Sequence, residues 1–581
     1  MDFNKNIPRP EYPRPQLVRE QWLNLNGPWQ FEIDSGRSGK ERGLIAAEKL
    51  KDEIIVPFCP ESKLSGVEYK DFMSAVWYKR EFTIPVEWSS GRILLHFGAC
   101  DYKTEVWING VSAGIHSGGY CSFKFDISKL LVNGKNIITV YAEDDVRSGL
   151  QPRGKQSSLF YSNGCDYTRT TGIWQTVWLE CVPEEYISSL KYIPDPDNGC
   201  VHIEGSVEGK SNDLSIETRA FFEGREIGSS RARVTGQRVA LTVNLSEIHL
   251  WGPGEPNLYD LEVTLYGDNN IDTVTSYFGM RTVTLSEKAI LINGKPVFQR
   301  LVLDQGFYPD GIYTAPTDND LKKDIEISMG LGFNGARMHE KVFEQRYIYW
   351  ADKLGYLVWG EYANWGLDIT TPKGLEVFLP EWMEALERDF NSPAVIGWCP
   401  FNETWDKHTG ARQDNEVLRL IYNVTKMADK TRPVIDTSGN YHVVTDIFDI
   451  HDYEQDTVQF AAKFLPMKNG GEVYNTFPER QEYRGQPYFV SEYGGIWWNP
   501  EQKDNKAWGY GDRPNSAEEF IARYEGLTAA LLDNPNICAF CYTQLYDVEQ
   551  EVNGLYTYRR EAKFDVNIIK KINTKKAAIE L

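Results

Sequence analysis

From Asn293 onward, apolar runs of strand length alternate with helical patterns of period 3.6, and this alternation limits the fold more than any other feature. A parallel sheet with crossover helices requires such an alternation. Eight runs fit into about 290 residues, close to the roughly 250 residues of a typical (β/α)₈ barrel. We therefore predict a TIM barrel over residues 287–581. The predicted strands are Phe298–Leu303, Gly332–Met338, Leu357–Glu361, Val395–Phe401, Val434–Thr437, Ile447–His451, Tyr488–Ser491 and Ile537–Thr543.

The last helix between two predicted strands has its own start signal. Ser516 and Glu519 stand three positions apart, as in a capping box. Apolar residues of helical spacing follow, so we expect a helix that packs one face on the sheet. The residues of that face are Phe520, Tyr524, Leu527 and Leu531.

Polar and aromatic residues follow almost every predicted strand. Barrels of this type carry their active sites at the C-terminal ends of the strands, so these residues are expected to line one pocket. In chain order they are Asp304 and Gln305, Arg337 and His339, Glu361, Asn402 and Glu403, His451 and Tyr453, Glu492 and Tyr493, and Gln544.

Glu403 and Glu492 are the strongest candidates for catalysis. They stand 89 positions apart (492 − 403), so only closure of the barrel brings them across its mouth. Two carboxyls that flank an acetal are the minimum equipment for glycoside hydrolysis, one as acid and the other as nucleophile or base. Repulsion from the ionised Glu492 is expected to keep Glu403 protonated before attack. A separation of about 5–5.5 Å predicts a covalent intermediate and retention of configuration.

Further residues are candidates for substrate binding. Asn402 is placed to bond the sugar 2-hydroxyl, and Arg337 to hold the nucleophile ionised, with a salt bridge at the barrel rim as the alternative. His339 either contacts the ligand or supports residues that do. Asp304 and Glu361 either bind sugar hydroxyls or brace loops.

Aromatic side chains complete the predicted pocket. Tyr453 follows the sixth strand, and Trp498 and Trp405 follow the two catalytic glutamates as stacking platforms for sugar faces. Trp365 and Trp497 are weaker candidates of the same kind.

The first half of the chain consists of short alternating runs separated by Gly, Pro and Asn-Gly turns, which predicts antiparallel sandwiches. Residues 1–183 are expected to form one β-sandwich, and residues 184–286 have the size of an immunoglobulin-like one. In the second unit, Val239–Asn244 and Tyr259–Leu265 are predicted strands.

Charge and composition exclude several classes of function. The net charge of −21 opposes binding to nucleic acid or to anionic membranes. The start of the chain has no apolar core of signal-peptide length, so we expect a cytoplasmic enzyme. Cys538 and Cys541 fall inside an apolar run and are expected to be ordinary strand residues. No residue set has the spacing of a metal site, and we expect neither a metal nor a cofactor.

Several motifs resemble glycoside hydrolase family 2, which contains β-galactosidases, β-glucuronidases and β-mannosidases. Val106-Trp-Ile-Asn-Gly110 and Gly172-Ile-Trp-Gln-Thr-Val-Trp178 are similar to its sugar-binding, jelly-roll-like sandwich, and Phe278-Gly-Met-Arg281 to its immunoglobulin-like domain. Phe401-Asn-Glu-Thr-Trp405 and Ser491-Glu-Tyr-Gly494 resemble its barrel signatures. The resemblance implies a retaining hydrolase with Glu403 as acid/base and Glu492 as nucleophile. It also leaves a homo-oligomer open.

The resemblance is weaker for the substrate. The loop after the first barrel strand lacks the histidine-rich segment of long β-galactosidases, and Asn553 is not followed by the lysine of the Asn-x-Lys pair found in β-glucuronidases. Asn573-Thr-Lys575 has that pattern but lies in the terminal helical tail. We therefore favour exo-acting release of a terminal neutral β-linked sugar, galactose-like and either pyranose or furanose. A β-galactofuranosidase, β-glucuronidase or β-mannosidase remains an alternative, and so does a non-catalytic carbohydrate-binding protein.

Overall fold

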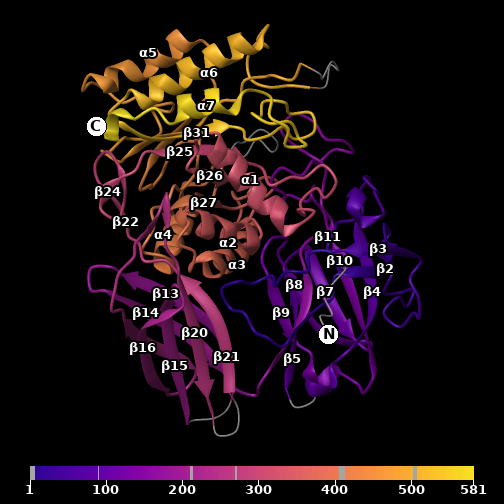
Figure 1. The fold of residues 1–581 in the computed structure, drawn as a ribbon. Helices are drawn as coiled ribbons and strands as arrows, with labels where there is room; N and C mark the ends of the chain where they lie inside the picture. The colour runs from indigo at the N-terminus through magenta and orange to yellow at the C-terminus, as the bar shows by residue number, and fades with distance from the viewer. Residues whose placement is uncertain are drawn as a thin grey trace.

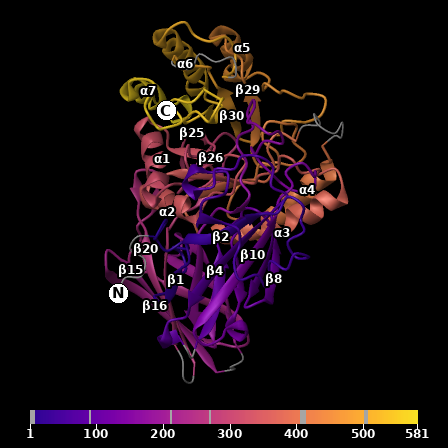
Figure 2. The ribbon, with the colours of Figure 1, turned by 90° about the vertical axis from the view of Figure 1, so that its right-hand side faces the viewer.

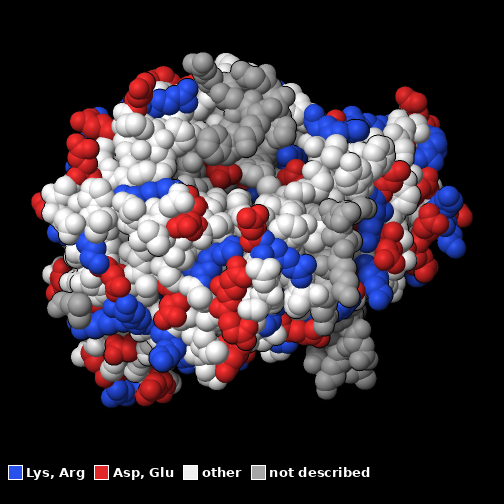
Figure 3. All heavy atoms as spheres, turned by 90° about the horizontal axis from the view of Figure 1, so that it is seen from above, with Lys and Arg blue, Asp and Glu red and all other residues white. Residues whose placement is uncertain are grey.

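The computed structural model describes residues 7–88, 91–209, 213–267, 271–404, 413–500 and 507–580. Two β-sandwiches lie side by side beneath a barrel of strands and helices (Figures 1 and 2). The face seen from above is hollowed near its centre, and charged side chains of both signs show there (Figure 3). Within the described residues, no helix is long and apolar enough to cross a membrane.

The first sandwich has two antiparallel sheets that enclose one apolar core. Alternation sets its faces, as in β2, where Trp29 and Phe31 point inward between more exposed neighbours. The four-stranded sheet has the order β1 (Trp22–Asn24), β12 (Val177–Val182), β5 (Arg92–Phe97), β9 (Phe123–Asp126). The six-stranded sheet has the order β3 (Asp52–Val56), β2 (Gly27–Ile33), β4 (Ala75–Thr83), β10 (Lys135–Glu143), β7 (Lys103–Ile108), β8 (Val111–Ser117), and a short pair joins β6 (Cys100–Asp101) to β11 (Gly172–Ile173).

The second sandwich is immunoglobulin-like and has a separate core. The two strands predicted in it are confirmed as β17 and β20. One sheet has the order β13 (Tyr186–Asp195), β14 (Cys200–Glu208), β17 (Arg238–Asn244), and the other β16 (Arg225–Val234), β15 (Leu214–Phe222), β20 (Tyr259–Tyr266), β21 (Ile271–Phe278). Short strands lead to the barrel: β18 (Trp251–Gly252) with β19 (Glu255–Pro256), and β22 (Val283–Leu285), β23 (Ile290–Ile292) and β24 (Lys295–Pro296).

The barrel is a curled parallel sheet surrounded by helices, as predicted. Within the described residues, seven strands form the sheet in the order β28 (Val395–Cys399), β27 (Leu357–Glu361), β26 (Gly335–Met338), β25 (Gln299–Asp304), β31 (Ile537–Thr543), β30 (Tyr488–Gly494), β29 (Phe448–Asp452). The helices are α1 (Asp318–Gly330), α2 (Gln345–Leu354), α3 (Pro372–Asp389), α4 (Asn415–Ala428), α5 (Thr457–Lys468), α6 (Ala517–Leu532) and α7 (Val566–Asn573).

The predicted helix start at Ser516 is confirmed in part. The Ser516 hydroxyl accepts from the Glu519 backbone N–H, and the predicted apolar face is buried. The Glu519 carboxylate, however, accepts from the backbone N–H of Asn515, 2.8 Å away, and not from that of Ser516. The reciprocal contact of the box is thus shifted by one residue.

The fifth predicted strand, Val434–Thr437, is not an assigned strand. Only isolated bridges, Trp398 to Val434 and Asn402 to Ser438, connect this segment to the chain of β28. Asp436 explains the difference, because its carboxylate accepts from the backbone N–H groups of Val443 and Val444 and draws the following loop back onto the segment. The strand is thereby replaced by side-chain bonding.

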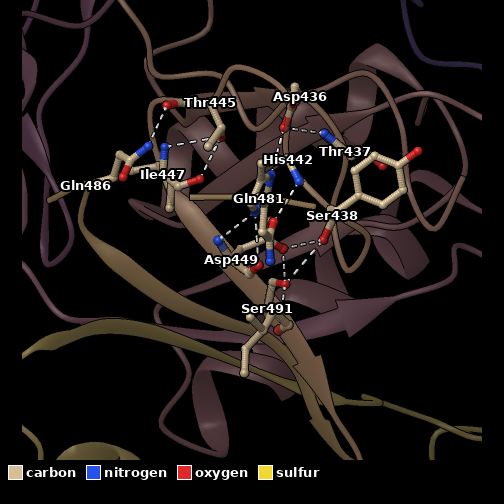
Figure 4. A network of polar contacts seen from close by, with 12 residues as sticks. Asp436, Thr437, Ser438, His442, Thr445, Ile447, Asp449, Gln481, Gln486 and Ser491 are labelled. Carbon is tan, nitrogen blue, oxygen red and sulfur yellow. Dashed lines mark hydrogen bonds and ion pairs between the residues drawn. The ribbon is translucent and has the colours of Figure 1, made fainter. Parts of the chain in front are cut away.

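A buried polar network closes the barrel at this gap (Figure 4). The His442 ring lies 2.7 Å from Asp436 and 3.2 Å from Asp449 of β29. Burial alone would lower the pKa of His442, but these two carboxylates raise it to about 10. Ser438 donates to Asp449 over 2.7 Å, so side chains connect the two edges where a backbone ladder is missing.

Candidate active site

The side chains of Glu403 and Glu492 meet at the carboxyl ends of the barrel strands. Glu492 lies within β30 and is buried, whereas Glu403 stands four residues beyond the end of β28. Glu403 has a φ of 42°, a left-handed conformation that turns the chain just after Asn402. One carboxylate oxygen of each glutamate and one ring nitrogen of His451 all lie within 4.8 Å of one another.

His451, at the end of β29, joins the two glutamates. Its Nδ1 lies 2.8 Å from Glu403, and its Nε2 lies 3.4 Å from Glu492 and 2.9 Å from the Ser438 hydroxyl. Burial alone would lower the pKa of His451, but the charges of Glu492 and Glu403 more than offset it and raise that pKa. A cationic imidazole thus reduces the repulsion between the carboxylates.

His451 stands among the polar residues noted at the strand ends, but it was not among the predicted site residues. A histidine directly after an apolar strand was the available signal. The sequence could not show that Glu403 is the hydrogen-bonding partner of His451, because the two residues stand 48 positions apart.

Arg337, from β26, is hydrogen-bonded to three other candidate residues. Its guanidinium donates to Glu492 over 2.9 Å, to Glu361 over 2.5 Å and to the Asn402 side-chain oxygen over 3.0 Å. Burial of Arg337 opposes its charge, yet Glu361 and Glu492 raise its pKa well above the ordinary value. Arg337 therefore stays cationic and fixes one oxygen of Glu492.

The Glu361 carboxylate is bonded to two neighbouring side chains of the site. Arg337 and His339 occupy its carboxylate, with the His339 Nδ1 3.2 Å away. Burial would raise the pKa of Glu361, but Arg337 and His339 lower it to about 2. Glu361 is therefore an anion that orients Arg337, and His339 supports the same contact.

Tyr453 and Asn402 lie at the pocket with groups directed to it. The Tyr453 hydroxyl donates to the second oxygen of Glu492, and its ring stacks on that of Tyr510 at 3.5 Å between centroids. The Asn402 side-chain nitrogen is buried and has no hydrogen-bond partner among the described residues. It is thus a donor that a sugar hydroxyl can satisfy.

The Asp304 carboxylate is bonded within the protein, beside the loop that follows β25. Its carboxylate accepts from the hydroxyls of Tyr546 and Tyr347 and from the Gly306 backbone N–H. Burial, followed by the nearby Asp324, raises the pKa of Asp304. Asp304 therefore braces the loop after β25, the alternative that the sequence had left open.

Trp498, predicted as a stacking platform, lies largely buried among other aromatic rings. Its side chain is 8% exposed and packs against Phe564 and Phe520. Trp405 lies outside the described residues. Trp365 is half-buried near the site, where its ring nitrogen donates to the Asn402 backbone oxygen over 3.2 Å and a sandwich lysine, Lys155, covers its face.

Comparison with known families covers most of the chain. Residues 23–183 match the sugar-binding domain of glycosyl hydrolases family 2, residues 186–281 match the model named glycosyl hydrolases family 2, and residues 283–503 match the TIM barrel domain of that family. The chain belongs to glycosyl hydrolase family 2.

Among curated relatives of this family-2 hydrolase are the β-glucuronidases of Felis catus and Homo sapiens. The cat protein is 28% identical over 479 residues and the human protein 26% over 473, in each case with 74% of this chain and 70% of the relative covered. Two solved structures share the fold. A β-glucuronidase from an uncultured Clostridium sp. has a TM-score of 0.79 at 21% identity, with 96% of this chain and 99% of that chain covered. The enzyme of Dictyoglomus thermophilum has a TM-score of 0.76 at 21% identity, with 97% and 98% covered.

Proposed function

We propose that this family-2 hydrolase removes a terminal β-linked sugar with retention of configuration, with Glu492 as nucleophile and Glu403 as acid/base. The proposal rests on the proximity of the two carboxylates: one oxygen of Glu403 and one oxygen of Glu492 lie within 4.8 Å of each other. Retaining glycosidases have their carboxyls about 5–5.5 Å apart, whereas inverting enzymes need about 6.5–9.5 Å to admit a water. The short separation supports the covalent route.

In the first step, a Glu492 oxygen attacks the anomeric carbon while the bond to the leaving oxygen breaks and Glu403 gives that oxygen a proton. Arg337 and Tyr453 hold the Glu492 carboxylate in place through one oxygen each. In the second step, Glu403 takes a proton from water, the water oxygen attacks the anomeric carbon, and Glu492 is released. The sugar keeps its configuration because the carbon is inverted twice.

His451 supports both steps through its contact with Glu403. A proton shared by an imidazole and a carboxylate 2.8 Å apart is available when the leaving oxygen needs it. The pair can also hold the proton taken from water in the second step.

For the sugar, we propose a β-glucuronide as the leading candidate. The relatives named above are β-glucuronidases, which gives the expected β-galactosidase preference no support. A neutral sugar is the second candidate, because Asn553 is followed by Gly554 and Leu555 and its side chain is bonded to Gln544 and Glu551. A carbohydrate-binding protein without activity would not require two acids held this close.

A panel of aryl glycosides tests the reaction and the sugar together. It should contain the β-glucuronide, β-galactoside, β-galactofuranoside, β-mannoside and an arabinoside. We expect hydrolysis of at least one member, with the β-anomer as the first product seen by NMR. The α-anomer as first product would contradict the double displacement.

Variants of the two acids test their roles. We expect Glu492→Ala and Glu403→Ala each to lower kcat by about 10⁴-fold on the best substrate, because each removes a group needed in the covalent route. Glu416→Ala, an exposed glutamate of α4, is the matched control and should leave the rate unchanged. A wild-type rate in either active-site variant would defeat the assignment.

A further inference from the structure

A loop of the first sandwich is hydrogen-bonded to the barrel beside the catalytic residues. In this loop, the Arg153 backbone N–H donates to the Trp365 oxygen over 2.8 Å, and the Gly154 N–H donates to the Ala363 oxygen over 3.3 Å. Gly154 has a φ of 55°, and a Cβ atom there would lie 2.2 Å from the Glu340 backbone oxygen. Only glycine permits this approach. Lys155, the next residue, is therefore held firmly against the barrel.

Lys155 is a buried cation for which the described residues supply no bonded partner. It is 6% exposed, and its ammonium lies 3.7 Å from the centroid of the Trp365 ring. Within the described part of the chain, the ammonium makes neither a hydrogen bond nor an ion pair. A buried charge normally requires such a partner.

The carboxylates around Lys155 are near it but bound elsewhere. Burial would lower the pKa of Lys155, whereas Cys165, Glu403, Glu551 and Glu492 raise it, so the ammonium keeps its charge. Glu492 is held by Arg337 and Tyr453, and Glu403 contacts His451.

Glu551 is committed in the same way. One of its oxygens accepts from the Tyr167 hydroxyl and the other from the Asn553 side chain. Burial raises the pKa of Glu551, which reduces its repulsion toward a nearby anion. Among the described residues, none of these carboxylates forms a hydrogen bond or an ion pair with Lys155. The same holds for Glu340, where burial raises the pKa of the carboxyl well above its usual value despite the nearby charge of Lys155.

The barrel loop after β31 does not supply an alternative cation. Asn553 is followed by glycine and leucine, and the ammonium of Lys563 is bonded to Asp547 over 2.5 Å and to the Trp498 backbone oxygen over 2.6 Å. In the described residues around the catalytic acids, the guanidinium of Arg337 is likewise hydrogen-bonded to Glu361 and Glu492. Lys155 is the cation left for a ligand.

We propose that Lys155 is a specificity residue that binds the carboxylate of a uronic acid as the terminal sugar. This subsite rests on the proposed glycosidase function and deepens it. The ammonium lies near both catalytic acids but contacts neither, so a sugar ring placed between those acids would present a ring substituent to it. A carboxylate satisfies both the charge and the missing hydrogen bond, whereas the hydroxymethyl group of a neutral hexose supplies only the hydrogen bond.

The test compares sugars that differ only at this substituent. The pairs are aryl β-D-glucuronide with β-D-glucoside, and aryl β-D-galacturonide with β-D-galactoside. We expect the wild-type protein to have a kcat/KM for the better uronide at least 100-fold above that for its neutral partner. In Lys155→Met, this ratio should fall by about 100-fold, because a site built to bond a charged group loses its discrimination with that bond.

Three further variants separate recognition from folding. Lys155→Arg keeps the charge and should retain part of the preference, and Lys155→Gln should behave like Lys155→Met. Lys103→Met makes the same change at an exposed position of the first sandwich and should leave the ratio unchanged.

Two results would overturn the subsite. The first is an equal loss on both sugars of a pair in Lys155→Met with an unchanged unfolding temperature. The second is a wild-type preference for the neutral sugars. Hydrolysis of neutral sugars alone would leave the proposed glycosidase function standing, whereas hydrolysis of no aryl glycoside would overturn that function together with the subsite.

Discussion

At the scale of single residues, the catalytic centre is an alternating arrangement of charges. Glu403, His451, Glu492, Arg337 and Glu361 follow one another as acid and base, each within contact distance of the next. Alternation of this kind lets three carboxylates occupy one buried space, since every anion has a cation beside it. The histidine is the member that can gain or lose its charge near neutral pH.

Replacing His451 tests whether it shares the catalytic proton. Because the pKa of His451 is raised above its usual 6.5, the pair with Glu403 keeps its proton to a pH above that value. In His451→Gln the proton must reside on Glu403 alone, because the imidazole no longer offers a second site for it. We expect kcat to fall about 100-fold and the alkaline limb of the kcat/KM profile to move to lower pH.

Glu492 and Arg337 also face the His451 ring. Glu492 raises the pKa of His451 and Arg337 lowers it, and the net shift is upward. A lower rate with the alkaline limb unmoved would assign His451 a packing role only.

At the scale of elements, seven of the eight predicted barrel strands are found in the described residues, because each of the seven is an apolar run that pairs with its neighbours in the sheet. The fifth failed for a physical reason. Val434–Thr437 has the composition of a strand, but Asp436 captures backbone N–H groups of the following loop, and no local pattern reveals where those groups will lie. For Asp304 the sequence left two roles open, since the tyrosines that bond its carboxylate stand 43 and 242 positions away.

The buried His442 network predicts a pH-dependent stability. The folded-state pKa of His442, about 10, exceeds its ordinary 6.5, so its stabilising contribution is complete below pH 6.5 and is lost as the pH rises to about 10. His442→Gln should lower the free energy of unfolding by about 3–5 kcal/mol at pH 6, because Asp436 and Asp449 lose their shared cation. The deficit relative to the wild type should shrink toward pH 10.

Unfolding temperatures at pH 6, 8 and 10 measure this effect. His202→Gln, which changes a partly exposed ring of the second sandwich, is the matched control. A deficit that stays constant across the range would show that the histidine is not the titrating group.

At the scale of the whole molecule, polar contacts join the domains at buried positions. The barrel residue Glu381, on α3, accepts from the backbone N–H groups of Tyr120 and Cys121 in the first sandwich, over 2.6 and 3.2 Å. Its other oxygen accepts from the Tyr362 hydroxyl over 2.7 Å. Such contacts were beyond sequence reasoning, since they pair residues about 260 positions apart. The same holds for Lys155, which stands 248 positions before Glu403 (403 − 155) in a stretch without strand or helix periodicity.

Removing the Glu381 carboxylate should loosen this junction. Glu381→Ala leaves two buried backbone donors and a tyrosine hydroxyl unsatisfied, and we expect it to lower the free energy of unfolding by about 3 kcal/mol or more. Glu387→Ala, an exposed glutamate on the same helix, should have almost no effect in the same denaturant titration. Equal stability of the two variants would mean that the junction does not depend on Glu381.

The glycine that admits Lys155 to the pocket has a consequence for chimeric enzymes. The catalytic acids come from the barrel, whereas the ammonium comes from the first sandwich. A hybrid that joins this barrel to a foreign N-terminal domain would therefore take its sugar selectivity from the foreign domain. A foreign loop with any larger residue at position 154 would collide with the Glu340 carbonyl, so grafting succeeds only when both surfaces are exchanged as a matched set.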